Sequence, residues 1–171
     1  MALEPPTNAR TANAQGVETQ SVGPGKRIGG RSELALFCTV APGGAAVFRE
    51  RLPRFQAEAA YWQARIGTAH DFRVFLFDDD RRLAVVMTYD GDFQTHVTDM
   101  FAQAGPWFDD VFSGVWEGYE GAHDPRSARR LLDCATTADL FYVAHPDVTV
   151  REIARMKRLS RAVGDVLDAA S

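Results

Sequence analysis

Residues 70–92 read HDFRVFLFDDDRRLAVVMTYDGD, and this stretch decides the fold. Two apolar segments, 72–77 and 83–89, flank a link of five polar residues, an ordinary length for the loop of a β-hairpin. Apolar side chains occupy both alternating positions of each segment. Because successive side chains of a strand point to opposite faces, we expect both faces of this hairpin to be covered.

An amphipathic helix is predicted on each side of the hairpin. Downstream, Asp92 is a suitable N-cap for a helix that Gly105-Pro106 ends. Upstream, apolar residues recur at intervals of 4, 3, 4, 3 and 4 and form a stripe down one side of a helix: Phe48, Leu52, Phe55, Ala59, Trp62 and Ile66. Pro53 interrupts this helix without changing the phase of the stripe, and Gly67 ends it. We therefore expect one kinked helix or two stacked pieces.

Further elements complete the series. Strands are predicted at Glu33–Val40 and Leu140–Ala144, with a short helix at Ser127–Ala135 between the hairpin and the last strand. Thr149 and Glu152 form a capping box that begins a final helix. Its inward-facing side chains are predicted to be Val150, Ile153, Met156, Leu159, Val163, Val166 and Leu167.

The order strand, helix, strand, strand, helix, strand indicates an α+β fold of the ferredoxin-like βαββαβ type. It predicts a four-stranded antiparallel sheet with helices on one face and an extra C-terminal helix. Helices on one face leave the other apolar face open, so we expect a homodimer packed sheet to sheet.

This order resembles the dimeric α+β barrel superfamily over residues 33–168. Two segments of the hairpin are similar to a pair that recurs in uncharacterised bacterial members of this superfamily. They are the entry to its first strand, Gly67-Thr68-Ala69-His70, and the exit from its second, Thr88-Tyr89-Asp90-Gly91-Asp92. The superfamily includes antibiotic-biosynthesis monooxygenase-like proteins, stress-responsive barrel proteins, haem-degrading enzymes, and relatives of chlorite dismutase and dye-decolourising peroxidases. The resemblance implies a ligand held between sheet and helices. The last helix lacks the haem-ligating histidine of the peroxidase relatives.

Composition narrows the function classes. Residues 1–31 hold no large aromatic side chain, so this arm is predicted to be disordered or loosely attached to a single domain, 32–171. The formal net charge of −4 points away from nucleic acid. No apolar run is long enough to span a membrane and no signal-peptide pattern begins the chain, so we expect a cytoplasmic protein. Cys38 and Cys134 are predicted to be buried, reduced thiols.

Three residues of the hairpin are the catalytic candidates. Arg73 stands between Phe72 and Val74, and its guanidinium needs either a carboxylate partner or a ligand anion. His70 suits a general base, an axial haem ligand or a hydrogen-bonded strand entry. Tyr89 would orient substrate oxygens, and His96 is the alternative haem ligand.

A second group of residues is predicted to bind substrate: Thr39, Phe75, Met87, Trp107, Trp116 and Tyr142. The aromatic run from Trp107 to Tyr119 suits either a lid or core packing. The acidic triplet 78–80 is predicted to be a solvated turn, and the histidines lack the spacing of a compact metal site.

Three functions remain open at this point. The first is an enzyme that oxidises or rearranges a small hydrophobic metabolite, aromatic or polyketide-like, without a tightly bound cofactor. The second is a haem-binding protein or haem-dependent oxidoreductase that uses His70 or His96. The third is a non-catalytic ligand-binding or assembly module.

Overall fold

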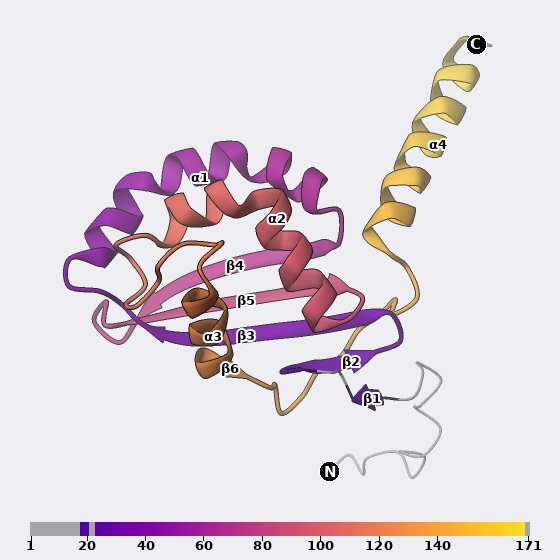
Figure 1. Cartoon of the computed structure of the whole chain (residues 1–171). Coiled ribbons are helices and arrows are strands. Elements are labelled where there is room, and N and C mark those ends of the chain that lie inside the picture. The colour runs from indigo at the N-terminus through magenta and orange to yellow at the C-terminus, as the bar shows by residue number, and fades with distance from the viewer. Residues whose placement is uncertain (1–17, 21–22, 170–171) are drawn as a thin grey trace, which may run out of the picture.

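The computed structural model describes residues 18–20 and 23–169. It shows an α+β protein with an antiparallel sheet, consistent with a ferredoxin-like fold (Figure 1). The strands are β1 (Glu18–Gln20), β2 (Lys26–Ile28), β3 (Arg31–Thr39), β4 (Ala69–Phe77), β5 (Arg82–Asp90) and β6 (Ala135–Thr136). The helices are α1 (Gly44–Ile66), α2 (Phe93–Phe112), α3 (Pro125–Cys134) and α4 (Val150–Ala169).

The predicted hairpin is confirmed as β4 and β5. The sheet runs β1-β2-β3-β5-β4, so β4 is an edge strand and β5 lies between it and β3. Asp78, Asp79 and Asp80 form the turn with positive φ angles, and the side chains of Asp78 and Asp80 bind exposed arginines. The acidic triplet is therefore a solvated turn, as predicted.

Helices α1 and α2 cover one face of the sheet (Figure 1). Their apolar side chains pack on alternate residues of the central strands, namely Leu34, Leu36, Cys38, Leu83, Val85, Met87 and Tyr89. Burying one such large side chain stabilises the fold by about 1.5–3 kcal/mol. The predicted stripe of α1 is confirmed, and α1 continues through Pro53 as one helix that ends at Gly67 in the left-handed conformation.

Helix α2 is longer than predicted. The backbone leaves helical geometry at Ala104 (φ −128°, ψ 16°) and then resumes it, so the helix kinks at Gly105-Pro106 instead of ending there. Proline is tolerated at this place because the first turn of a helical segment needs no N–H from it. The kink carries the aromatic run into the core, where Trp107, Phe108 and Phe112 are buried. The core-packing alternative for this run is the one observed.

The opposite face of the sheet carries exposed aromatic side chains. Phe37, Phe75 and Phe77 are 41–48% exposed, and the rings of Phe37 and Phe77 meet edge to face at 6.3 Å. The described residues leave this apolar face uncovered, so the expectation that both faces of the hairpin are covered is not met within one chain. The sheet-to-sheet homodimer stays a prediction.

The predicted strand at Leu140–Ala144 is wrong. The last strand is β6, which pairs with Ala35 and Leu36 of β3, and residues 137–149 are irregular. Two other segments share the edge of β3, since β2 pairs with Arg31 and Ser32 and β6 pairs with Ala35 and Leu36. Residues 23–31 also differ from the loosely attached arm that was predicted, since β2 joins the sheet and Arg31 is buried. Residues 1–17, 21 and 22 of that arm lie outside the described part.

The final helix begins as predicted but packs differently. The Thr149–Glu152 capping box is present, with Thr149 N donating to Glu152 Oε2 at 2.8 Å. The prediction that its apolar side chains face inward is wrong, because no described residue of α4 is buried. The helix leaves the domain and extends away from it (Figure 1).

Candidate functional site

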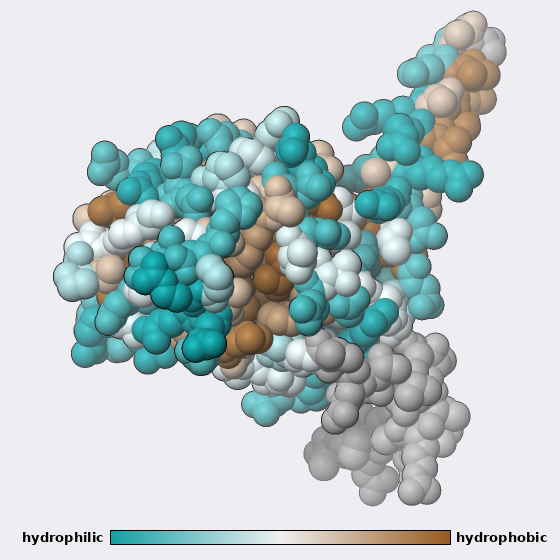
Figure 2. All heavy atoms as spheres, viewed as in Figure 1, coloured by the Kyte–Doolittle hydropathy of each residue, from teal (hydrophilic) through white to brown (hydrophobic). Residues whose placement is uncertain are grey.

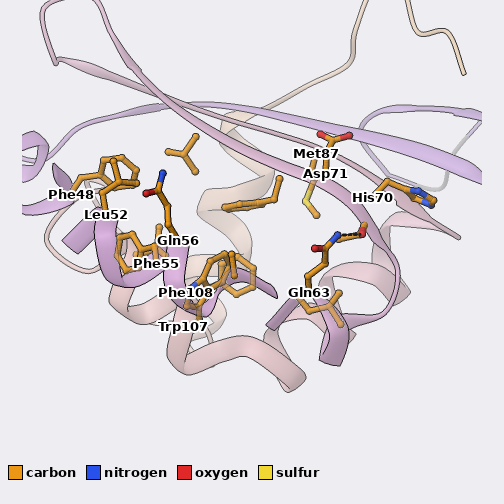
Figure 3. A pocket seen from close by; sticks show the side chains of 16 residues that line it. Phe48, Leu52, Phe55, Gln56, Gln63, His70, Asp71, Met87, Trp107 and Phe108 are labelled. Atoms are coloured by element: carbon orange, nitrogen blue, oxygen red, sulfur yellow. Dashed lines mark hydrogen bonds between the residues drawn. The ribbon is translucent and has the colours of Figure 1, made fainter. Parts of the chain in front are cut away.

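A cavity of about 450 Å³ lies between α1, the second half of α2 and the hairpin (Figure 3). Half-buried residues of the edge strand β4, among them Phe72 and Val74, line the cavity together with residues of α1. Aromatic and aliphatic side chains dominate its lining: Phe48, Leu52, Phe55, Ala59, Ile66, Ala69, Phe72, Val74, Met87, Trp107, Phe108 and Val111.

The aromatic wall is rigid because its rings pack on one another. Trp107 contacts Phe72 at 5.5 Å, Phe55 at 6.4 Å and Phe108 at 5.1 Å between ring centroids. The crossed geometry of these pairs is the one that aromatic quadrupoles favour. The cavity therefore has a preformed apolar wall.

Polar groups border this wall at a few points. Gln56 and Gln63 of α1 are exposed and mark the mouth of the cavity, and Gln63 Nε2 donates to Ala69 O at 3.3 Å. Trp107 is 6% exposed, and its indole Nε1 has no hydrogen-bond partner among the described residues. An unpaired buried donor is uncommon in proteins and calls for a partner.

His70 lies at one end of the cavity, held by a carboxylate. Its Nε2 lies 2.8 Å from Asp90 Oδ1, and Figure 3 shows its ring turned away from the aromatic wall. The pairing of β4 with β5 shifts between Ala69 and Asp71, so His70 is the extra residue of a bulge. The hydrogen-bonded strand entry, one of the predicted alternatives, is the observed arrangement.

Arg73 lies on the open face of the sheet, opposite the cavity. Its guanidinium pairs with Asp71 (Nη2–Oδ1 2.9 Å), and its side chain is 54% exposed. The same carboxylate accepts a hydrogen bond from the Thr88 hydroxyl. The predicted carboxylate partner is thus present, and the expectation of a buried guanidinium is wrong because none of the described helices covers this face.

Tyr89 and His96 form a separate buried pair beneath α2. Their rings stack at 3.9 Å, and His96 Nδ1 lies 3.0 Å from the Thr68 hydroxyl. Burial lowers the pKa of His96 to about 4 and raises that of Tyr89 above its ordinary value. Neither residue lines the cavity. The three catalytic candidates therefore do not converge on one point.

Of the predicted substrate-binding residues, Met87 and Trp107 line the cavity. Trp116 is buried in the core beside Phe112. Thr39 and Phe75 lie exposed on the open face, and Tyr142 is exposed in the irregular segment. Gln56 and Gln63 were not among the predicted site residues. Their positions gave a signal, since each follows a residue of the α1 stripe, Leu52 or Ala59, by four positions and so flanks the stripe on the same side.

The described residues offer poor ligands for a metal or haem in this cavity. No group of three histidine, cysteine or acidic side chains in the described ranges could hold a metal ion. His70 turns its ring away from the aromatic wall, and His96 lies outside the cavity, so neither fits an axial haem ligand there. Cys38 is buried, Cys134 is half-buried, and burial and the neighbouring Cys134 thiol raise the pKa of Cys38.

The chain was also compared with known proteins. No protein-family model, curated protein or solved structure matches it. Among the helices of the described part, none combines the length and apolarity needed to cross a membrane.

Proposed function

We propose that this protein binds a small, mainly apolar molecule in the cavity between α1, α2 and the hairpin. The observation that carries the proposal is the aromatic cavity of about 450 Å³, whose lining includes Trp107, a residue with a buried indole N–H that has no partner among the described residues. Ligand sites in proteins usually have volumes of about 300–1,000 Å³, with apolar walls and a few polar groups that orient the ligand.

The wall suits a flat ring system. Phe55, Phe72 and Trp107 present ring faces and edges from three different elements, so a planar ligand can pack against several of them at once. Aromatic and polyketide-like metabolites belong to this chemical class.

The donor defines one polar requirement of the ligand. An indole N–H can only donate, so its partner must be an acceptor such as a carbonyl or hydroxyl oxygen. Gln56 and Gln63 add amide donors and acceptors at the mouth. The ligand is therefore expected to carry an oxygen acceptor on an apolar ring body.

Calorimetric titration with two probes tests the proposal. Naphthalene has only a ring body, and 2-acetylnaphthalene adds a carbonyl. Ala59→Trp fills the cavity and is expected to abolish binding of both probes, whereas Ala102→Trp, on the exposed side of α2, leaves both unchanged. Trp107→Phe removes the donor and shortens the aromatic surface that both probes contact, so the loss of the donor is measured by comparison: the acetyl probe should lose about three- to tenfold more affinity than naphthalene does. Binding that survives Ala59→Trp would place the ligand elsewhere and refute the proposal.

One observation favours a second candidate, proton transfer on the bound molecule. Asp90 holds the His70 imidazole by Nε2 at 2.8 Å, which is how a carboxylate orients a general base, and this base would act on a part of the ligand that extends past the aromatic wall to the His70 end of the cavity. Mass spectrometry follows the conversion of a panel of metabolites by the protein. With ligand binding in the cavity and His70 as the base, His70→Gln retains probe binding but abolishes this conversion. Unchanged conversion in His70→Gln would exclude His70 as the base.

The fold also supports a finer proposal, that β6 is the fourth strand of a complete βαββαβ series. The support is its position in the chain after α2 and its antiparallel pairing with β3, on the side of β3 away from β5.

A further inference from the structure

Helix α4 presents an apolar stripe that the rest of the described chain does not cover. Met156, Leu159, Val163 and Val166 are 52–68% exposed, although they lie on one side of the helix. Figure 2 shows this stripe in brown along the projecting helix. In proteins most of the stability of an amphipathic helix comes from packing of its apolar face. The stripe therefore requires an occupant.

The domain of the same chain cannot supply that occupant in this arrangement, because the start of α4 is fixed. Val150 N donates to Asp90 Oδ2 at 2.8 Å, and the Arg31 guanidinium donates to Val148 O. Gly30 N donates to Pro146 O at 3.1 Å, in the segment that leads to the helix. These contacts aim α4 away from the sheet, and folding it back onto its own core would break them.

The spacing of the stripe suits a second helix. Its four residues follow one another at intervals of 3, 4 and 3, the a and d spacing of a two-helix seam. The partner is thus expected to be an amphipathic helix, and α4 of another copy is one.

The charges of α4 select its orientation. Residues 150–161 hold five basic side chains and one acidic, whereas residues 162–169 hold two acidic and no basic side chains. This order opposes the helix dipole, which favours acids near the N-terminus and bases near the C-terminus. An antiparallel neighbour of the same sequence relieves both conflicts, because each basic half then lies beside an acidic half.

We propose that two copies of this chain associate through their α4 helices, packed antiparallel with the stripes facing each other. Leu159 of one copy lies opposite Val163 of the second, and Met156 lies opposite Val166. The contact is two-fold symmetric, with the axis near residue 161. This assembly is independent of the cavity and of what it binds.

Sedimentation equilibrium of the full chain tests the association. We expect a mass of twice 18.9 kDa for the wild type, and at least a tenfold weaker dimer for the double variant Leu159→Gln/Val163→Gln. Leu132→Gln, an exposed leucine of α3, is the matched control and leaves the dimer unchanged. Circular dichroism establishes that each variant is folded.

Three results would overturn the proposal. The first is a wild-type protein that sediments as a monomer at 100 μM, whether or not it binds vesicles of anionic phospholipid. The second is a Leu159→Gln/Val163→Gln variant that dimerises as strongly as the wild type. A dimer that Phe75→Gln abolishes while the α4 variant does not would assign the interface to the open face of the sheet.

Disulfide formation tests the orientation. Met156→Cys and Val166→Cys are prepared separately in a Cys134→Ser background, in which the remaining Cys38 is buried, then mixed and oxidised. The antiparallel pair predicts a disulfide that joins position 156 of one copy to position 166 of the other in excess over either self-linked product. Predominance of the self-linked products would show a parallel pair and contradict the proposal.

Discussion

The imidazole of His70 and the carboxylate of Asp90 form a 2.8 Å hydrogen bond that joins the beginning of β4 to the end of β5. Asp90 Oδ1 makes this bond and also lies 3.5 Å from Arg31 Nε, while Asp90 Oδ2 accepts a hydrogen bond from the backbone N–H of Val150. One carboxylate thus ties together the edge of the cavity, the start of β3 and the first residue of α4. Its side chain is 13% exposed, so these contacts are only weakly screened by water.

Removing this carboxylate should be costly. Asp90→Ala leaves the buried Arg31 charge, His70 Nε2 and Val150 N without their partner, and is expected to lower the free energy of unfolding by about 3 kcal/mol. Asp90→Asn retains the size and one acceptor and should cost about half as much. Urea unfolding measures both. Asp99→Ala, an exposed carboxylate of α2, is the control and should change stability by less than about 0.5 kcal/mol. Equal effects at the two positions would contradict the role given to Asp90.

Stability should depend on pH through His96. Burial lowers its pKa from 6.5 to about 4, so the folded state binds its proton less readily than the unfolded state does. The neutral His96 therefore contributes roughly 3 kcal/mol to the free energy of unfolding above pH 6.5, and this contribution is lost as pH falls toward 4. His96→Phe keeps the stacking on Tyr89 but cannot titrate. The difference in unfolding free energy between wild type and His96→Phe should therefore shrink as pH falls from 7 to 5. The exposed His123→Gln serves as control, and a constant difference for His96→Phe would refute the prediction.

Two glycine substitutions should act with opposite sign. At Gly44 an added Cβ would lie 2.8 Å from Val115 O and 2.9 Å from Gly114 O, both backbone atoms, so Gly44→Ala should destabilise the fold by more than about 1 kcal/mol. At Gly164 in α4 nothing lies within 4 Å of an added Cβ, so Gly164→Ala should stabilise the helix by about 0.5–1 kcal/mol. Thermal unfolding compares them directly. A gain at Gly44 would show that the chain after α2 packs less closely on α1 than described.

The location of the site predicts a silent substitution. Arg73 pairs with Asp71 on the open face of the sheet, so Arg73→Ala should leave the affinity for 2-acetylnaphthalene within twofold of wild type. A large loss of affinity would instead place the ligand on the open face, beside Arg73.

Much of this fold was predictable because local patterns agree with it. The spacing of the Phe48–Ile66 stripe predicts helix α1. The two segments with apolar side chains on both faces predict strands β4 and β5. Competition between segments was not visible in the sequence. The Leu140–Ala144 pattern suits a strand, but β2 occupies part of the edge of β3 that it would need. The stripe of α4 was read correctly as apolar, yet nothing local reveals whether a helix packs on its own chain.

The site was less predictable than the fold for a specific geometric reason. Alternation along β4 places His70 on the same face as Phe72, but the bulge after Ala69 turns it toward Asp90. Alternation correctly separates Arg73 from Phe72, but it does not say which face the helices cover. Trp107 and Met87 do line the cavity, and they were proposed because ligand pockets are lined mainly by large apolar side chains.

The most direct test of the central claim uses the three tryptophans as internal probes in a ¹H–¹⁵N NMR titration with 2-acetylnaphthalene. Trp62 Nε1 donates to Glu58, Trp116 lies away from the main cavity, and Trp107 alone of the three lines it. Binding in this cavity predicts that the Trp107 indole resonance moves downfield to saturation while the Trp62 and Trp116 resonances stay in place. A saturating shift confined to Trp62 or Trp116, or no indole shift at concentrations that saturate calorimetric binding, would contradict it.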